Sequence, residues 1–492
     1  MSAETMLGAQ PAAAPADNTA RNRLVIALLL VSTFVVFLNE TIMSVAIPHL
    51  MTDLNVTASA AQWLTTAFLL TMAVVIPITG FLLQRLNTRP IFMLAMSIFS
   101  VGTLICAVSP GLELLVFGRV IQATGTAIMM PLLMTTVMTL VPPASRGKTM
   151  GNISIVISVA PALGPTIGGF ILDFLDWRWI YILVLPIALG ALVLGIVKIK
   201  NVSTPRYAPL DIISVILSAF AFGGIVYGLS SIGEGVAHPE MVLVPAWIPL
   251  AIGLVSMGIF IWRQLNLQKD DKALLDFRTF ASKNYAFAVM TMAVAMMALF
   301  GTVILLPIYT QNVLGLSTLN TGLILLPGGL LMGLLAPTVG RLYDKIGATK
   351  LLVPGTIIVS AVLWMLTLVD QNTPVWAVVV GHITISLGLA LVFTPLFTAS
   401  LSSVPSKLYS HGSAILGSIQ QVAGAAGVAL FIAMMTIRTA SLSAEGAAPI
   451  DALSGGIRMG FLCGAIISLL AVAGAFFVRK PDDADAPPHA GH

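Results

Sequence analysis

Long apolar runs fill most of this chain and constrain its fold more than any single motif does. Of the 492 residues, 58% are hydrophobic and only 9% are charged. A soluble domain of this length could not hide so much apolar surface from water. Inside a bilayer, every backbone polar group must be paired within the protein, so a chain of this composition crosses the membrane as helices. The sequence therefore predicts an all-α polytopic membrane protein.

Fourteen of the apolar runs are long enough to cross a bilayer. Residues 1–20 are rich in Ala and Pro and are expected to form a disordered tail, and a second tail is expected at residues 479–492. No cleavage site precedes the first run, so we expect it to remain as a membrane anchor. We expect spans at residues 24–48, 61–83, 91–109, 112–140, 148–173, 178–198, 211–232, 243–263, 284–312, 319–341, 350–369, 374–402, 410–437 and 456–478.

The distribution of basic residues predicts the orientation of these spans. If both termini are cytoplasmic, Arg178, Arg438 and Arg458 lie outside, Arg119 lies within a span, and the rest of the 24 Lys and Arg residues lie inside. Cytoplasmic loops of membrane proteins carry such an excess of Lys and Arg. The sequence therefore predicts a multi-pass plasma-membrane protein with both termini in the cytoplasm.

An internal repeat relates the two ends of the chain. PITG at 77–80 ends the second span and PTVG at 337–340 ends the tenth, while Gly118-Arg119 and Gly381-His382 mark the fourth and twelfth. With Pro307 matching Pro48 and Pro395 matching Pro131, the offsets run from 259 to 264 residues. Two related bundles with a central site between them are a common transporter design. We therefore predict a tail at 1–20, a six-helix bundle at 21–200, two inserted helices at 201–283, a second six-helix bundle at 284–478 and a tail at 479–492.

The fifth span combines an apolar composition with several helix breakers. Residues 151–170 contain Gly164, Pro165, Gly168 and Gly169. In lipid, a helix with such residues survives with a kink, and its glycines let a neighbouring helix approach closely. We interpret these four residues as a conformational seam, and the alternative is a kinked helix that serves packing alone.

Several segments resemble one family. GPTIGG at 164–169 resembles the fifth-helix signature of antiporters in the major facilitator superfamily, and LNETIMSVAIP at 38–48 resembles that family's L-D-x-T-I-V-N-V-A-L-P. WLTTAFL at 63–69 and LPIYTQ at 306–311 also follow the family pattern. The 6+2+6 arrangement is similar to the 14-helix drug:proton antiporters, with the closest likeness to lincomycin-resistance-type multidrug exporters. This resemblance implies a major facilitator fold and proton-coupled drug efflux.

The loop between the second and third spans departs from the family pattern G-x-L-x-D-R-x-G-R. Residues 80–89 read GFLLQRLNTR, without the acid, whereas GRLYDKIG at 340–347 keeps Asp344. The resemblance implies that such loops gate the cytoplasmic side. The candidates are Arg85, Arg89, Gly340 and Asp344, and control of topology is the alternative for the two arginines.

Two charged residues lie well inside spans. A charge at mid-membrane costs at least ~3 kcal/mol, so each is a functional candidate. Glu40 and Arg119 both lie roughly 10–12 Å below the outer face at 1.5 Å per residue, and we expect them to meet or to share water and protons. The resemblance ties the arginine to proton coupling and places the usual acid at Asn39. The alternatives are a snorkelling Glu40 and an Arg119 that only bonds helix backbone.

Other polar residues at membrane depth complete the candidate site. His382 occupies the Arg119 position in the second copy and could carry a proton, although a neutral core histidine is the alternative. Some of the remaining polar groups should line a substrate cavity between the bundles, while others will only bridge helices. The cavity candidates are Asn39, Ser44, Gln122, Tyr309, Gln311 and Gln420.

The function we predict is a proton-coupled efflux antiporter that exports lipophilic drugs or endogenous amphiphiles by alternating access. A proton-coupled importing symporter for a small metabolite and an uncoupled lipid or amphiphile translocator remain alternatives. Without a nucleophile or metal constellation, an enzyme is disfavoured. Without a G-x-x-x-x-G-K-[ST] loop, ATP is not the expected driving force. We expect no cofactor and no metal, no nucleic-acid partner, and a monomer in the lipid bilayer.

Overall fold

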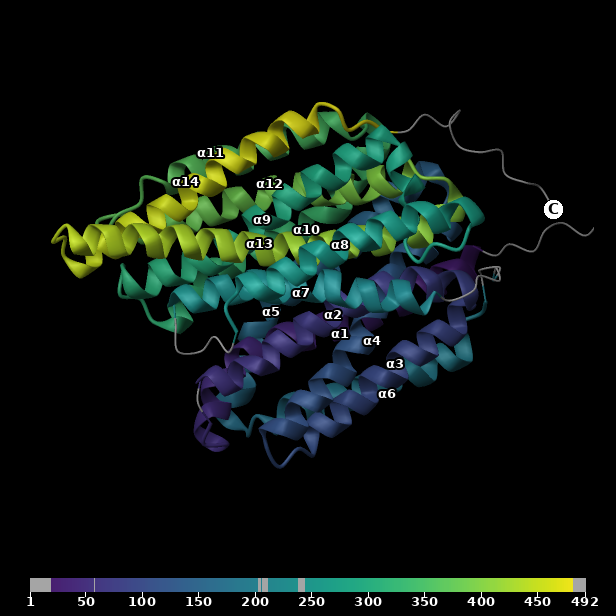
Figure 1. Cartoon of the computed structure of the whole chain (residues 1–492), viewed down its shortest axis with the longest axis horizontal. Coiled ribbons are helices and arrows are strands. Elements are labelled where there is room, and N and C mark those ends of the chain that lie inside the picture. The colour runs from purple at the N-terminus through teal and green to yellow at the C-terminus, as the bar shows by residue number, and fades with distance from the viewer. Residues whose placement is uncertain (1–18, 57, 202–204, 206–210, 238–243, 481–492) are drawn as a thin grey trace, which may run out of the picture.

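The computed structural model describes residues 19–56, 58–201, 205, 211–237 and 244–480. Within these ranges the chain forms fourteen long α-helices and no strand, which confirms the predicted fold class (Figure 1). The expected tails fall mostly on residues 1–18 and 481–492, which lie outside the described residues, as do the side chains of Ser44 and Pro165.

The helices fall into three consecutive sets. The first set, called the N-terminal bundle, contains α1 (Thr19–Asp53), α2 (Ala58–Arg85), α3 (Thr88–Ala107), α4 (Leu112–Leu140), α5 (Arg146–Phe174) and α6 (Arg178–Lys198). The inserted pair is α7 (Ile212–Ala237) and α8 (Trp247–Leu267). The C-terminal bundle contains α9 (Lys283–Asn312), α10 (Thr318–Ile346), α11 (Thr349–Leu366), α12 (Val375–Ser402), α13 (Tyr409–Ala444) and α14 (Pro449–Ala475).

Short 3-10 helices, capping serines and a glycine at positive φ lie at several of the helix ends. Among the described residues, four such turns lie at Pro143–Ser145, Gln268–Asp270, Phe277–Ala281 and Ser406–Leu408. The hydroxyls of Ser282 and Ser317 accept backbone N–H bonds at the starts of α9 and α10. Helix α13 continues past the predicted end of its span at residue 437 and ends at Ala444. Gly446 follows its end at φ 87°, a conformation that favours glycine.

Thirteen helices of the described chain are long and apolar enough to cross a membrane. Many large apolar side chains point away from the protein. Val197 in α6 and Trp247 and Trp262 in α8 are 68%, 68% and 67% exposed. Such surfaces belong in lipid rather than in water. The chain is therefore a multi-pass membrane protein.

The two bundles repeat the same packing scheme. In the N-terminal bundle α3 packs on α4 and α6, and α1 packs on α5 and α6; in the C-terminal bundle α11 packs on α12 and α14, and α9 packs on α13 and α14. Each of these helices of the N-terminal bundle is thus matched by the helix eight places later in the chain. The internal repeat seen in the sequence corresponds to this duplicated arrangement (Figure 1).

Contacts between the bundles run along two pairs of long helices. Helix α5 packs extensively on α10, and α2 packs on α13. We call the end of the molecule where α1 begins and α14 ends the terminal face. Near this face the backbones of Gly147 in α5 and Gly340 in α10 lie in direct contact, and Gly80 in α2 lies against Ser410 and Ala414 in α13. The two bundles therefore close together at the terminal face.

The inserted pair lies at the side of both bundles. Helix α7 packs on α13 of the C-terminal bundle and on α2 of the N-terminal bundle, whereas α8 packs chiefly on α7 (Figure 1). Arg263 in α8 holds Asp211, just before α7, through two hydrogen bonds of 2.7 and 2.8 Å. The pair is thus tied together at the end nearest the terminal face.

Candidate functional site

Arg119 in α4 is buried in the N-terminal bundle, with 1% of its surface exposed. Its Nη1 donates to Oε1 of Gln122 at 2.7 Å and to Oδ1 of Asn39 at 3.4 Å, and its Nε donates to the carbonyl of Leu64 at 3.4 Å. The guanidinium carbon lies 4.0 Å from the ring centroid of Phe68. Helices α1, α2 and α4 thus hold a buried cation by polar and cation–π contacts.

Glu40 is the next residue after Asn39 in α1, and its Oε2 is buried without a hydrogen-bond partner. Arg119 acts on it electrostatically, but no ion pair joins the two among the described residues. One residue along a helix turns the side chain by about 100°. Of the two relationships expected for Glu40 and Arg119, direct contact is not seen, because the amide of Asn39 occupies that place and the carboxyl lies beside the cluster. The sharing of water and protons stays a prediction.

Two of the cavity candidates, Gln122 and Tyr309, are buried and make hydrogen bonds within their own bundles. Gln122 is fully buried; besides accepting from Arg119, its Nε2 donates to Oγ1 of Thr103 in α3 at 2.9 Å. Tyr309 is also fully buried, and its hydroxyl donates to the carbonyl of Asp370 at 2.7 Å. The structure therefore places both residues in bundle interiors, where they position other groups.

The remaining cavity candidates have different surroundings. Asn39 is 1% exposed and bound to Arg119, so it belongs to the buried cluster. Gln311 in α9 and Gln420 in α13 are half-buried. Ser44 lies in α1, but its side chain is outside the described residues. Of these candidates, the two glutamines keep the partial exposure that a cavity wall requires.

His382 in α12 is held against α10. Its Nε2 lies 3.1 Å from the carbonyl of Leu325, and a carbonyl can only accept, so Nε2 carries the proton. The Nδ1 atom is buried without a partner. The imidazole also fills the space that a side chain at Gly328 would need. This environment favours the neutral core histidine over the proton carrier.

The predicted seam in α5 faces α1. A methyl group on Gly164 would collide with Thr41, and one on Gly168 would lie 3.0 Å from Cγ2 of Ile42. The Thr41 hydroxyl also lies 3.2 Å from the carbonyl of Ala160 in α5. Two of the three glycines therefore allow α1 and α5 to pack at backbone distance, next to Glu40.

Gly169 is an exception to the predicted seam. A methyl group added there would meet no atom within 4 Å, because this residue faces away from α1. Its neighbour Gly168 makes the contact, since successive residues of a helix point in different directions. Among the glycines, Gly164 and Gly168 thus make the contact with α1 and Gly169 does not, whereas the Pro165 side chain lies outside the described residues.

At the terminal face, Asp344 bridges the two bundles. Its Oδ1 accepts the backbone N–H of Gly147 and its Oδ2 accepts that of Lys148, both at 2.9 Å. These N–H groups belong to the first turn of α5, where a helix favours negative charge. Together with the backbone contact at Gly340, this carboxylate forms a latch between α10 and α5. That it gates the cytoplasmic side stays a prediction.

The two arginine candidates lie elsewhere on the terminal face. The guanidinium carbon of Arg85 lies 5.7 Å from the ring centroid of Phe81 in its own helix. The side chain of Arg89 is exposed, and its backbone N–H donates to Oδ1 of Asn201 at 3.3 Å. The first contact lies within the N-terminal bundle, and the second joins it to the segment that follows α6. Neither contact adds a link to the Asp344 latch.

A second latch, between α2 and α13, was missed from the sequence. Nε2 of Gln84 lies 2.7 Å from Nε2 of His411, which is 4% exposed. Gln84 stands where the second copy carries Asp344, so the acid that the first copy lacks is replaced by an amide with a different partner. A glutamine at that place and a histidine opening the thirteenth span were the signals available.

Two hydroxyl bridges between the bundles were also missed. Thr135 in α4 lies 2.9 Å from Ser413 in α13, and Thr394 in α12 donates to Ser154 in α5 at 2.8 Å. Thr394 follows Thr135 by 259 residues, and Ser413 follows Ser154 by the same 259. Each bridge is therefore the repeat counterpart of the other.

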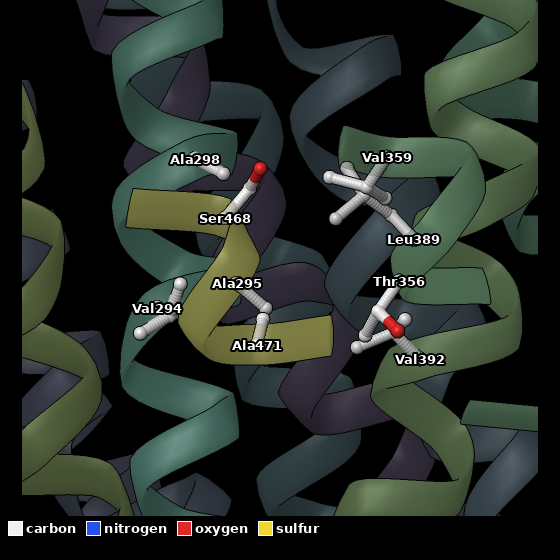
Figure 2. Close-up of a pocket in the computed structure, with 9 residues that line it drawn as sticks. All are labelled: Val294, Ala295, Ala298, Thr356, Val359, Leu389, Val392, Ser468 and Ala471. Carbon is white, nitrogen blue, oxygen red and sulfur yellow. The ribbon is translucent and has the colours of Figure 1, made fainter. Parts of the chain in front are cut away.

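Figure 2 shows a small pocket that lies within the C-terminal bundle rather than between the bundles. Its walls come from α9, α11, α12 and α14, and they are apolar apart from Thr356 and Ser468. The Ser468 hydroxyl donates to Ser360 at 2.8 Å. The pocket does not touch the N-terminal bundle, so it is not the cavity we expect. It is lined by Val294, Ala295, Ala298, Thr356, Val359, Leu389, Val392, Ser468 and Ala471.

The duplicated bundles and buried charged cluster define a helical membrane transporter, and comparison with known proteins specifies the family. The Major Facilitator Superfamily profile matches residues 29–428. The human organic anion transporter MFSD10 has a similar fold, with a TM-score of 0.66 and 15% identity over 92% of this chain and 99% of that one. This chain belongs to the major facilitator superfamily, whose members are transporters and not enzymes.

Curated relatives resemble the chain over most of its length. The uncharacterized MFS-type transporter YcnB of Bacillus subtilis is 38% identical over 93% of this chain and 95% of its own. The lincomycin resistance protein LmrB of Listeria monocytogenes is 38% identical over 93% and 96%. A multidrug resistance protein B homolog of Mycobacterium tuberculosis is 29% identical over 80% and 73%. The predicted resemblance to lincomycin-resistance-type exporters is confirmed.

Proposed function

We propose that this protein is a proton-coupled antiporter that exports lipophilic drugs or endogenous amphiphiles by alternating access. It would act as a monomer in the plasma membrane, without a cofactor, with the terminal face in the cytoplasm. The names of the lincomycin and multidrug resistance relatives support drug export. The proton gradient would be the driving force.

The observation that carries this proposal is a buried carboxyl that lies near a buried guanidinium but forms no ion pair with it. Arg119 is bound by Asn39 and Gln122, whereas Oε2 of Glu40 is buried without a partner. A buried oxygen without a partner is tolerated more easily on a neutral carboxyl than on a carboxylate. The present conformation therefore favours a protonated Glu40, and one that hydrates this residue would favour its charged form.

Transport follows if proton binding differs between the two conformations, because a ligand with equal affinity for both shifts nothing. Glu40 lies one residue before Thr41, which contacts the α5 seam at Gly164. A change in the charge of Glu40 thus occurs next to the place where α1 and α5 pack most closely. Loss of the proton to the cytoplasm would complete the cycle once the terminal face opens.

The direct test uses purified protein in proteoliposomes with an imposed pH gradient. Lincomycin and a fluorescent lipophilic monocation serve as probes, and uptake against their gradients is measured with and without a protonophore. Antiport predicts that substrate and protons move in opposite directions and that the protonophore abolishes accumulation. Movement in the same direction would indicate a symporter, and accumulation that survives the protonophore would contradict proton coupling.

A further inference from the structure

The inserted pair is connected to the terminal-face latch by a continuous series of hydrogen bonds. The series begins at Gln264 in α8, whose side chain is fully buried. Its Nε2 donates to the hydroxyl of Ser214 in α7 at 2.6 Å. Its Oε1 accepts the backbone N–H groups of Leu274 at 2.7 Å and Leu275 at 3.3 Å. One amide thus joins α7, α8 and the linker that leads to α9.

The linker itself is fixed by a compact set of charges. Asp276 is buried, accepts the backbone N–H of Arg278 at 2.9 Å and pairs with its guanidinium. The same guanidinium bonds Asp271, at the start of the linker. Leu274 and Leu275 are 2% and 1% exposed. Because both ends of this short segment are held, the carbonyl of Leu274 has a defined direction.

That carbonyl faces the second latch. Nδ1 of His411 lies 3.2 Å from the oxygen of Leu274. The oxygen can only accept, so Nδ1 carries the hydrogen, and Nε2 of the neutral ring is left as an acceptor for the amide N–H of Gln84. The linker thereby sets both the ring orientation and the tautomer that the contact with α2 uses.

We propose that the inserted pair holds the terminal face shut through this linker, with Gln264 as the positioning residue. Gln264 fixes Leu274, and Leu274 orients His411 toward Gln84. The inference rests on the proposed alternating access, since a gate matters only if it opens during the cycle. It assigns to the two inserted helices a part in the transport cycle that a purely lipid-facing hairpin would not have.

The linkage stabilises one conformation only. The bonds of Gln264 and Leu274 stay on the side of the inserted pair and the C-terminal bundle, so they persist when the bundles separate. The bond between His411 and Gln84 crosses to the N-terminal bundle and must break. A bond present in the closed form alone shifts the equilibrium, and its loss should move the closed-to-open ratio by about fivefold.

The test is a distance measurement between spin labels at Lys198→Cys in α6 and Lys350→Cys in α11, both exposed near the terminal face. A Cys463→Ala background removes the half-buried native thiol, and Cys106 is fully buried. Double electron–electron resonance on the full-length protein in nanodiscs, without substrate or pH gradient, gives the populations of short and long distances. Gln264→Leu should raise the long-distance population about fivefold relative to the short one.

Two variants establish that the effect runs through the linkage. Gln84→Ala should open the face to a similar extent, and combining it with Gln264→Leu should add nothing further, because both changes remove the same bond. His411→Asn keeps a donor for Leu274 but is too short to reach Gln84, so it should open the face as well. If Gln264→Leu does not yield monodisperse protein, His411→Asn serves as the test variant in its place.

The matched control is Arg263→Gln, which alters the neighbouring residue of α8. Arg263 pairs with Asp211, which also accepts from the Ser214 hydroxyl, but the two bonds from the Gln264 oxygen to the linker do not involve it. The distances should therefore not change. Equal opening by Arg263→Gln and Gln264→Leu would reduce the effect to general loosening and overturn the proposal. So would unchanged distances in folded Gln264→Leu and His411→Asn. Because no proton gradient is applied, these results stand whether or not transport proves proton-coupled.

Discussion

The guanidinium of Arg119 is bound by the amide oxygen of Asn39, 3.4 Å away, and not by the carboxyl of the residue that follows. Neutral amide oxygens therefore satisfy the guanidinium, and Glu40 keeps an unpartnered oxygen. A direct ion pair would have to break each time the carboxyl took up a proton. The observed arrangement leaves the carboxyl free to gain or lose a proton without breaking that contact.

The first prediction is that Glu40→Gln abolishes proton-driven accumulation while substrate binding persists. A glutamine cannot change charge, so it cannot bias two conformations with pH, and accumulation should fall by roughly tenfold or more. Downhill exchange of substrate should continue. Transport by proteoliposomes with and without a pH gradient provides the measurement, and full gradient-driven accumulation by this variant would exclude Glu40 as the proton site.

The second prediction concerns the neighbouring residue. Asn39→Asp in the Glu40→Gln background should recover part of the coupling, because the new carboxyl would stand directly against Arg119. Arg119→Lys should retain less activity than the parent, since a lysine cannot reproduce the three directed bonds of the guanidinium. The same transport assay applies. If Asn39→Asp gives no recovery although the protein binds substrate, position 39 cannot host the proton.

The third prediction separates the glycines of α5. Gly164→Ala places a methyl group against Thr41 and should reduce transport severely, because helices that pack at backbone distance must then move apart. Gly169→Ala meets no neighbour within 4 Å and should behave like the parent protein. Initial rates normalised to folded protein give the comparison. Equal damage from both substitutions would mean that the contact with α1 is not what the glycines serve.

The fourth prediction addresses the hydroxyl bridges. Thr135→Val and Thr394→Val each remove one hydrogen bond between the bundles while keeping the side-chain shape. Each change should favour separation of the terminal face by about 1 kcal/mol, or about fivefold. Distances between labels at the terminal face report the shift. The two substitutions are repeat counterparts, so a large effect from one and none from the other would contradict their equivalence.

The fifth prediction concerns pH and the inserted pair. Hydrogen bonds from Arg263 lower the pKa of Asp211 to about 2. A depressed pKa contributes stability above the unfolded-state value near 3.8, and this contribution is lost as the pH falls toward 2. Asp211→Asn should therefore destabilise the protein by about 2 kcal/mol at neutral pH. Thermal unfolding in detergent should show this difference shrinking below about pH 4, and a difference that is independent of pH would exclude the ion pair as its source.

The fold could be predicted because run length, basic-residue asymmetry and the repeat all report on single helices or on their order. The candidate site was harder to predict from the sequence than the fold was. The sequence identified Arg119 as lying within a span but left open whether Glu40 meets it, because depth along a helix does not specify the direction of a side chain. The latch between Gln84 and His411 depends on how α2 crosses α13, and a sequence does not contain that packing geometry.

The equal offset of the hydroxyl bridges gives the contact between the bundles the character of a twofold homodimer interface. A threonine of one half meets a serine of the other, and the reverse contact occurs at the symmetry-related place, which is the rule for isologous association. In a homodimer of identical subunits, any substitution would appear at both symmetry-related contacts at once. Fusion into one chain removes that constraint, so the charged Asp344 latch and the uncharged Gln84–His411 latch can occupy equivalent positions and respond differently to salt.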